Sequence, residues 1–413
     1  MVQTNNNHAI FGSFQLGGNV LSEKNILEGI RIIDASTVLA APLIANLLGD
    51  FGAEVIKIEQ PNTGDQTRNF GAGTWKVTNR NKKVITLDFN KEKGVHLYYQ
   101  LVSKADVVIT NFRPETLKKW KIDYPDLVRI KENIVMIHFS AFGRNGPYSE
   151  KPGFARVAES FSGLTYMTGY PDRKPVFAGY PIADAMGGVY GAFSVMLALY
   201  HYKQTGEGQL VDLSLYEPLI RVMENYITDY DLEGKIPERV GTHNPVVAPN
   251  DLYDTKDHKW IVLPASTQNI FERLMKAIGH PELVKDPRFL TNPLRVKNRE
   301  QLDEYLLPFF SEHTLEHLCE ILEEHGVAHS SVNSVADLYN DPHVQERENI
   351  ISVFDYALNK EIKMQGIVPK FSKTPGQVKW AGAPLGWHNN EIYQGLLNLS
   401  DEELSYLKQQ GVI

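Results

Sequence analysis

Runs of Val, Ile and Leu alternate with amphipathic stretches through the first half of the chain. Each run is short and almost continuously apolar, which is typical of strands that are covered on both faces of a parallel sheet. Helix-like segments lie between the runs, for example Ala41–Phe51 and Lys93–Ser103. This alternation predicts an α/β fold with a doubly wound parallel sheet. The six expected strands lie at 30–35, 53–58, 83–89, 105–110, 133–139 and 209–215.

The pattern changes at about residue 229, where polar and turn-forming residues interrupt the alternation. One strand at Trp260–Pro264 and several amphipathic helices up to about His325 are expected next. Alternating strands return near 350–372, and a helix is expected at about 401–410. These changes predict a large Rossmann-like domain and a smaller α+β domain. We place the large domain at 1–228 and 326–413, and the small domain at 229–325.

Composition narrows the class of protein. The net charge of −8 argues against nucleic acid as a partner. The single cysteine, Cys319, rules out a disulfide framework and fits a reducing cytosol. The first eight residues lack the basic and apolar regions of a signal peptide. The longest apolar stretch, Gly187–Tyr202, is shorter than the roughly 20 residues that span a bilayer, so we expect a cytoplasmic protein that is not inserted in a membrane.

Asp184 is the main candidate for catalysis. It stands at the start of a long apolar helix-like segment and is followed by Gly187 and Gly188. The free N–H groups and the dipole of a helix start favour an ionised carboxylate. Glycines without side chains let an acyl group approach the backbone closely. The alternative is that Asp184 only caps the helix, and this segment alone does not separate the two roles.

The turn after the first expected strand excludes one large class of enzyme. A dinucleotide-binding fold carries G-x-G-x-x-G at this turn. Residues Asp34–Pro42 contain no glycine, which argues against a nicotinamide or flavin enzyme. Basic residues do follow the expected strands, where phosphates bind in such folds, although an ordinary charged surface has the same pattern. They are Lys57, Arg68, Arg80, Lys82, Lys83, Arg113, Lys118 and Lys119.

His313 and His317 have the i, i+4 spacing that places two metal ligands on one helix face. The motif is not H-E-x-x-H, and the sequence offers no evident third ligand. A surface helix is therefore the favoured interpretation, and we expect no metal.

Several short blocks carry a family resemblance through their order and spacing. They are Val38–Pro42; Ala53–Glu59 with Gly64-Asp65 and Arg68; Asn79–Lys83 with Leu87-Asp88; Ala105–Val108 with Asn111–Pro114; Phe142-Gly143 with Gly146–Tyr148; the segment around Asp184; and Thr205–Gly208. Together they resemble CoA-transferase family III, the family of formyl-CoA:oxalate and carnitine-related CoA-transferases.

The resemblance implies an activity and a set of partners. The protein would transfer CoA between an acyl-CoA thioester and a free carboxylic acid, with CoA as a carrier substrate and no permanently bound cofactor. Asp184 would form a mixed anhydride and then an aspartyl-CoA thioester. The resemblance also implies a homodimer whose two chains are interlinked.

The resemblance further assigns roles to individual residues. Gly187, Gly188, Val38 and Leu39 would surround the reacting acyl group, with backbone N–H groups that stabilise an oxyanion. Lys119 occupies a position where the family usually has an arginine that binds phosphate. The implied CoA-binding residues are Lys82, Asn111, Phe112, Arg113, Lys119 and Arg68.

Two alternatives to transfer remain. An acyl-CoA racemase of the same superfamily keeps the aspartate but pairs it with a histidine where this chain has Phe154, which has no proton to move. A catalytically silent subunit of a heteromeric transferase would not need Asp184. Arg156 also has two interpretations: it binds a second carboxylate of the substrate, or it pairs with Glu159 on a helix face.

Overall fold

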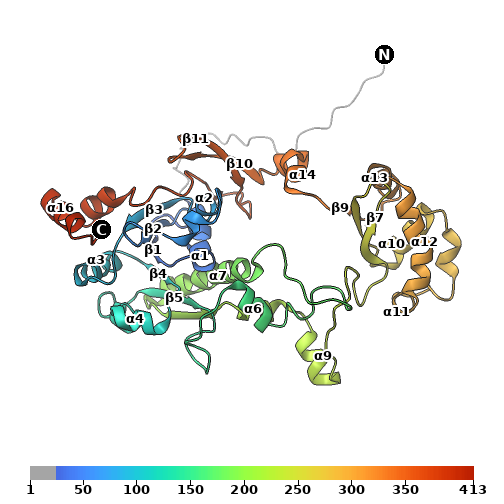
Figure 1. Ribbon diagram of the computed structural model, residues 1–413, viewed down its shortest axis with the longest axis horizontal. Helices are drawn as coiled ribbons and strands as arrows, with labels where there is room; N and C mark the ends of the chain where they lie inside the picture. The colour runs from blue at the N-terminus through green and yellow to red at the C-terminus, as the bar shows by residue number, and fades with distance from the viewer. Residues whose placement is uncertain (1–24) are drawn as a thin grey trace, which may run out of the picture.

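The computed structural model describes residues 25–413, and its larger part surrounds one six-stranded sheet (Figure 1). The strand order is β3-β2-β1-β4-β5-β6, and every neighbouring pair is parallel. The prediction of a doubly wound parallel sheet is confirmed, with one strand inside or overlapping each predicted run. The strands are β1 Arg31–Ala35, β2 Glu54–Glu59, β3 Lys82–Thr86, β4 Val107–Thr110, β5 Val135–Ser140 and β6 Leu210–Ser214.

Helices cover both faces of this sheet, which explains why its strands are apolar without interruption. Ile32 and Ile33 are neighbours on β1, point to opposite faces, and are both fully buried, each in a different core. One face is covered by α1 Ala40–Asp50, α6 Ala155–Phe161, α7 Ile182–Thr205 and α8 Glu217–Val222. The other is covered by α3 Glu92–Ser103, α4 Pro114–Trp120, α5 Tyr124–Val128, the π-helical segment η3 Glu391–Leu396 and α16 Asp401–Gln409.

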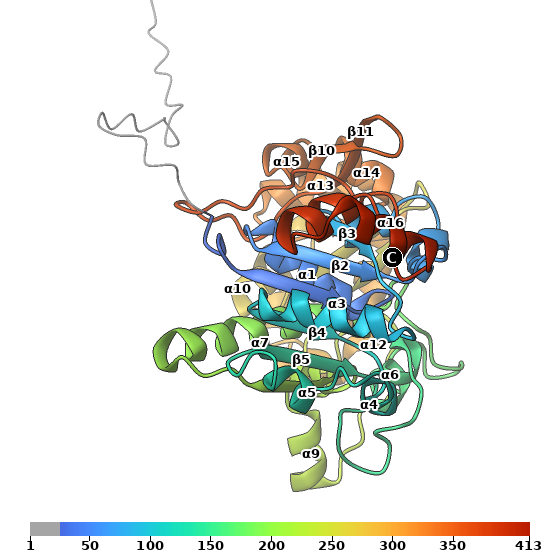
Figure 2. The ribbon, with the colours of Figure 1, turned by 90° about the vertical axis from the view of Figure 1, so that its left-hand side faces the viewer.

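The C-terminal segment belongs to the core of the large sheet. Figure 2 shows α16 beside α3 on the face that is turned toward the viewer. The hydroxyl of Tyr393 in η3 donates to the backbone oxygen of Thr86 in β3 at 2.7 Å, across 307 positions of the sequence. Leu404 and Leu407 of α16 pack into the same core as Leu101 of α3. The last residues of the chain thus complete one face of the sheet.

A second unit lies apart from the large one in Figure 1 and has a core of its own. An antiparallel sheet, in the order β7-β8-β9, packs against helices α10 to α13, as the predicted α+β character requires. Its strands are β7 Asn250–Asp254, β8 Trp260–Pro264 and β9 Ser330–Ser331. Its helices are α10 Gln268–Ala277, η2 Pro281–Lys285, α11 Asn292–Lys297, α12 Arg299–Glu312 and α13 Leu315–Glu324.

The remaining elements connect these two units or lie at their edges. The hairpin β10–β11 is antiparallel and follows two short helices. η1 and α2 follow β2, and α9 follows α8. Their bounds are η1 Gln66–Asn69, α2 Thr74–Thr78, α9 Tyr226–Glu233, α14 Val335–Asn340, α15 Pro342–Glu346, β10 Ile350–Asp355 and β11 Lys360–Gln365.

Helix α7 is longer than the apolar stretch that the sequence suggested. It has 24 residues, and among residues 25–413 it is the one helix long and apolar enough to cross a membrane. The expectation of a segment too short to span was therefore wrong in length, because the helix begins at Ile182, before the apolar stretch, and continues through the polar residues that follow Tyr202. In this fold α7 packs against α1 and the sheet through one face. The N-terminal residues considered for a signal peptide lie outside the described range.

Candidate functional site

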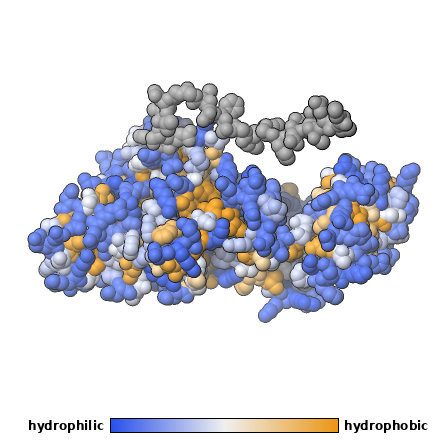
Figure 3. Space-filling view, turned by 90° about the horizontal axis from the view of Figure 1, so that it is seen from above, coloured by the Kyte–Doolittle hydropathy of each residue, from blue (hydrophilic) through white to orange (hydrophobic). Residues whose placement is uncertain are grey.

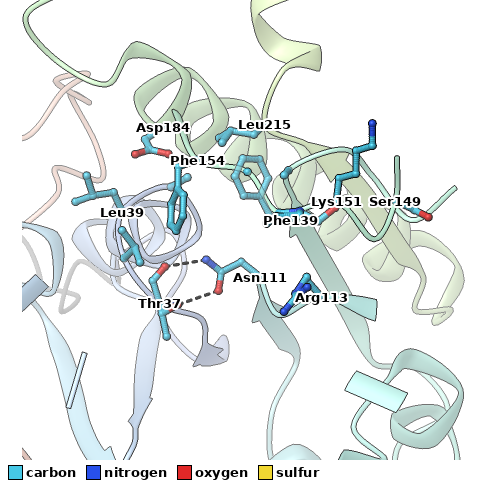
Figure 4. Close-up of a pocket in the computed structure, with 16 residues that line it drawn as sticks. Thr37, Leu39, Asn111, Arg113, Phe139, Ser149, Lys151, Phe154, Asp184 and Leu215 are labelled. Atoms are coloured by element: carbon cyan, nitrogen blue, oxygen red, sulfur yellow. Dashed lines mark hydrogen bonds between the residues drawn. The ribbon is translucent and has the colours of Figure 1, made fainter. Parts of the chain in front are cut away.

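A pocket of about 310 Å³ opens at the carboxyl ends of β1, β4 and β5 (Figure 4). In the strand order, β1 has β2 on one side and β4 on the other, so the direction in which successive strands are added to the sheet reverses at β1. This switch point is where open α/β sheets bind ligands. The pocket is lined by Thr37, Val38, Leu39, Ala40, Asn111, Arg113, Phe139, Ser140, Ala141, Ser149, Lys151, Pro152, Gly153, Phe154, Asp184 and Leu215.

Asp184 contributes its carboxyl group to the wall of this pocket (Figure 4). It lies in the first turn of α7, whose N-cap is Pro181, so the N-cap alternative for Asp184 is wrong. Within the described part of the chain, the carboxylate accepts no hydrogen bond and forms no ion pair. A half-buried carboxylate without a structural partner is available to react with a ligand.

The pKa of Asp184 is raised to about 6. Burial is the main cause, because it disfavours the charged form, and the nearby carboxylate of Glu159 raises the pKa further. The positive charge of Arg156 acts in the opposite direction. The expectation that the helix start alone keeps Asp184 ionised therefore needs correction, since ionisation is largely complete only at neutral pH and above.

Glu159 is a buried carboxylate, 1% exposed, that the sequence analysis treated only as a partner of Arg156. The guanidinium of Arg156 bonds to Glu159 at 2.7 Å and to the backbone oxygen of Ala178 at 2.9 Å. It also lies 4.7 Å from the ring centre of Phe177. Arg156 does not line the pocket, and the structure has the i, i+3 pair with Glu159 rather than a guanidinium free for substrate.

Gly187 and Gly188 are buried in the packing of α7. A Cβ atom at Gly187 would overlap the ring of Phe139 on β5, and one at Gly188 would lie 2.5 Å from Leu43 on α1. Neither glycine lines the pocket. Their role in this structure is to bring α7 close to the sheet and to α1, which places Asp184, and the predicted approach of an acyl group to their backbone is not what they provide.

The turn between β1 and α1 forms another wall of the pocket. Val38 and Leu39, the residues predicted to contact substrate, line it, and Asn111 lies beside them. The N–H of Val38 is donated to Asp65, so it is not available to an oxyanion. The side-chain amide of Asn111 is likewise engaged with the backbone of Thr37 (Figure 4).

Two cationic side chains reach this pocket, Arg113 and Lys151. Arg113 was predicted to bind CoA, and Lys151 was missed. Lys151 lies in the loop between β5 and α6, and its position after a strand was the signal that would have identified it. Both residues line the pocket, but in Figure 4 the ammonium group of Lys151 points away from Asp184, and it lies 3.7 Å from the ring centre of Tyr148.

Lys82 is not available to a phosphate in this structure, contrary to the prediction. It is fully buried, and its ammonium group bonds to Asp34 at 2.8 Å, Asn79 at 2.9 Å and the backbone oxygen of Pro42 at 2.7 Å. Burial lowers its pKa to about 8 even though Asp34 opposes that shift. Through its bonds to Asp34 on β1 and to Pro42, Lys82 thus holds the first turn of α1 against the end of the strand.

Three other predicted CoA contacts lie outside the pocket. Arg68 forms a two-point bond with Glu59 at 2.9 and 2.6 Å and stacks 3.6 Å from the ring centre of Trp75. Phe112 packs into the core on the α3 face, with its ring centre 5.0 Å from that of Trp120. Lys119 is exposed on α4.

His313 and His317 do not share a helix. α12 ends at Glu312, and Thr314 caps α13, so the backbone turns between the two histidines. His313 contacts the backbone oxygen of Phe309 and His317 contacts Glu320. Within residues 25–413 no group of three or more His, Cys, Asp or Glu side chains is arranged to hold a metal ion.

Comparison with known proteins finds one protein family whose profile and members match almost the whole chain. The profile of CoA-transferase family III matches residues 27–389. A succinyl-CoA–D-citramalate CoA-transferase of Chloroflexus aurantiacus is 39% identical, over 94% of this chain and 98% of that protein. The human succinyl-CoA:glutarate CoA-transferase is 30% identical, over 94% and 90%. A crystal structure of a CAIB/BAIF family protein from Brucella suis superposes with a TM-score of 0.82 at 31% identity, over 90% and 100%.

Proposed function

Because the chain belongs to CoA-transferase family III, we propose that it transfers CoA from succinyl-CoA or a similar thioester to a second dicarboxylic acid. The relatives support this class of substrate, since their names pair succinyl-CoA with citramalate, L-malate or glutarate, all dicarboxylic acids. The dicarboxylate that the sequence suggested through Arg156 gains support from these relatives. It gains none from the geometry of Arg156, whose guanidinium is engaged with Glu159.

Asp184 is the proposed nucleophile. Its carboxylate attacks the thioester carbonyl, the C–S bond breaks, and a mixed anhydride and CoA thiolate result. The thiolate attacks the carbonyl of Asp184, which releases the donor acid and leaves an aspartyl-CoA thioester. The acceptor carboxylate then attacks that thioester and expels the thiolate, which finally attacks the acceptor acyl carbon and frees Asp184. No water is consumed in the cycle.

The observation that carries this proposal is the position of Asp184 in the pocket. It is a carboxylate without a structural partner at the sheet's switch point, and Arg113 and Lys151 line the same pocket. Arg113 and Lys151 would bind the anionic part of CoA while the thioester reaches Asp184. Phe154 also lines this pocket, at the place where a racemase needs a proton carrier, and this favours transfer over racemisation.

The test is Asp184→Asn, which preserves shape and removes the nucleophile. We expect the variant to fold like the wild type and to lose CoA transfer by at least about a thousandfold, since covalent catalysis is abolished. In the wild type, incubation with succinyl-CoA and hydroxylamine should leave a hydroxamate on the peptide that contains residue 184. Substantial turnover by Asp184→Asn, or an unmodified peptide, would contradict the assignment. A panel of monocarboxylic and dicarboxylic acceptors, followed by mass spectrometry, tests the substrate class.

The proposed assembly is a homodimer with interlinked chains. Exposed apolar side chains support it, because α7 presents Phe193 and Leu197 outward, 57% and 54% exposed, and α9 has no buried residue. Figure 3 shows apolar side chains gathered toward the middle of the molecule. The relatives include alpha and beta subunits of a succinyl-CoA–L-malate CoA-transferase, each 36% identical, so a heteromer is the alternative.

A further inference from the structure

Val38 has an unusual backbone conformation for its residue type. Its φ angle is 70°, in the left-handed region, and β-branched residues occupy that region only when their surroundings hold them there. Val38 follows β1 and precedes α1, so its conformation determines how the chain turns into the helix. Thr37, Val38, Leu39 and Ala40 together form one wall of the pocket that contains Asp184.

Asp65 supplies the contact that holds Val38. The N–H of Val38 donates to the two carboxylate oxygens of Asp65 at 3.2 and 3.4 Å. The side chain is fixed by Thr67, whose N–H and hydroxyl donate to Oδ1 at 2.9 and 2.7 Å. The ammonium group of Lys57, fully buried, lies 3.4 Å from Oδ2. Asp65 is 3% exposed, so this carboxylate is anchored in the interior and does not reach the pocket itself.

The same wall is held from its other side by Asn111. The amide oxygen of Asn111 accepts the N–H of Thr37 at 2.9 Å, and its NH₂ donates to the oxygen of Thr37 at 2.8 Å (Figure 4). Asn111 follows β4 and Asp65 precedes η1, so two separate segments fix two consecutive residues. Because hydrogen bonds hold both Thr37 and Val38, the turn is fixed in one position relative to Asp184.

We propose that Asp65 is a positioning residue of the active site. By accepting the N–H of Val38 it keeps that residue left-handed, and so it sets the pocket wall of residues 37–40 without touching substrate. The proposal rests on the proposed function, because the wall matters through the reaction at Asp184. It assigns a role to the buried Lys57–Asp65 pair beyond stability, since the ammonium group of Lys57, 3.4 Å from Oδ2, helps to hold the carboxylate in its orientation toward Val38.

The test begins with Asp65→Asn, which preserves size. The amide oxygen can replace Oδ1 and still accept from Thr67, but the nearer acceptor of the Val38 N–H, Oδ2 at 3.2 Å, becomes an NH₂ group, and both groups are donors. Val38 is expected to leave the left-handed region, and kcat/KM for CoA transfer is expected to fall by about tenfold or more per folded protein. Circular dichroism and thermal melting supply the folded fraction.

Glycine and asparagine at position 38 distinguish positioning from general stability. Both tolerate the left-handed region, and asparagine does so with a side chain similar in size to valine. In the Asp65→Asn background, Val38→Gly or Val38→Asn should raise kcat/KM by about fivefold to tenfold. Val38→Ala is the matched control. Alanine also shortens the side chain, but its Cβ atom still makes the left-handed conformation unfavourable, so it should give little rescue.

Two results would overturn the proposal: an Asp65→Asn variant as active as the wild type, or a Val38→Gly double variant no better than Asp65→Asn alone. If Asp65→Asn does not fold, the double variant decides, because recovery of folding by glycine supports the role and failure contradicts it. A wild-type protein without CoA transfer would count against the proposed function instead. The same variants would then be compared by calorimetric affinity for CoA, where the same order of rescue is expected.

Discussion

At the scale of single residues, the surroundings of Asp184 are set by one buried carboxylate and one arginine. Burial raises the pKa of Asp184 most, Glu159 raises it further by charge repulsion, and Arg156, which is bonded to Glu159, opposes that effect. A carboxyl group with a raised pKa is protonated, and cannot attack, until the pH exceeds that pKa. The arginine is therefore an indirect control on the pH range in which Asp184 is a nucleophile.

We expect Arg156→Met to move the acid limb of the pH profile upward. In the wild type, kcat/KM for transfer should rise with pH through about 6, the pKa of Asp184. Without the guanidinium, Glu159 loses its ion pair and the pKa of Asp184 rises further, so activity at pH 6 falls by several-fold while activity at pH 8 changes less. The measurement is kcat/KM from pH 5 to 9.

The control for this experiment is Arg173→Met, which removes an arginine that is 74% exposed, lies 3.9 Å from Asp172 and stands 5.6 Å from the ring centre of Tyr170. Its acid limb should coincide with that of the wild type. An unmoved limb in Arg156→Met would show that Arg156 does not act on Asp184. A changed ratio of dicarboxylate to monocarboxylate acceptors in Arg156→Met would instead revive the interpretation that this arginine binds substrate.

The sequence identified some of these residues and not others, for physical reasons. Asp184 became the candidate nucleophile through the family resemblance, because a carboxylate at the start of an apolar, glycine-containing helix does not by itself separate a nucleophile from an N-cap. Lys82 was misjudged because its charge is satisfied by Asp34, 48 positions earlier, and sequence spacing does not reveal such a partner. Glu159 was noted as a partner of Arg156, but its burial beside Asp184 depends on how α6 packs on α7.

At the scale of elements, α7 owes its position to glycines at its contacts with α1 and β5. Gly188 faces Leu43 and Gly187 faces Phe139, each without space for a methyl group. The close approach allows the first turn of α7 to reach the switch point of the sheet. The geometry of Asp184 thus depends on packing one turn further along its helix.

We expect Gly188→Ala to destabilise the protein by about 1–3 kcal/mol, because the added methyl group overpacks the α1–α7 contact. Urea unfolding followed by circular dichroism gives the change, and transfer activity should fall with it as Asp184 is displaced. Gly179→Ala is the matched control, since no atom lies within 4 Å of the place that its methyl group would occupy, and it should change stability by less than about 0.5 kcal/mol. Equal effects of the two substitutions would contradict this account.

The local apolar pattern predicted most elements of the large sheet. It predicted fewer of the elements of the small unit. The six parallel strands are buried on both faces, so their apolar runs are unambiguous. β7 Asn250–Asp254 and β9 Ser330–Ser331 were missed because the first is polar in three of five positions and the second has only two residues. Both are defined by pairing with β8, which is a tertiary property.

At the scale of the molecule, the apolar outer faces of α7 and α9 indicate a partner. Tyr200 is 62% exposed and Leu232 is 75% exposed, and large apolar side chains that gather on a surface often mark an interaction site. A stable interface buries roughly 1,200 Å² or more in total. A second copy of the chain is the proposed cover.

We expect light scattering at micromolar concentration to give about twice the chain mass of 46.7 kDa. Interlinked chains cannot separate without unfolding, so tagged and untagged dimers that are mixed after purification should form no mixed species. Co-expression of the two forms is the control, and it should yield mixed dimers. A monomer, or exchange of subunits between folded dimers, would contradict the interlinked assembly.

The position of η3 and α16 in the core of the sheet has a consequence for biosynthesis. A ribosome releases β1 to β6 well before residues 391–413 leave its exit tunnel. At about 5–20 residues per second, the intervening chain takes roughly ten seconds or more to translate. During that interval the nascent sheet lacks the cover that Leu404 and Leu407 later provide. The period of exposure to chaperones and to aggregation is thus set by the length of chain between β6 and η3, a large part of which forms the second unit.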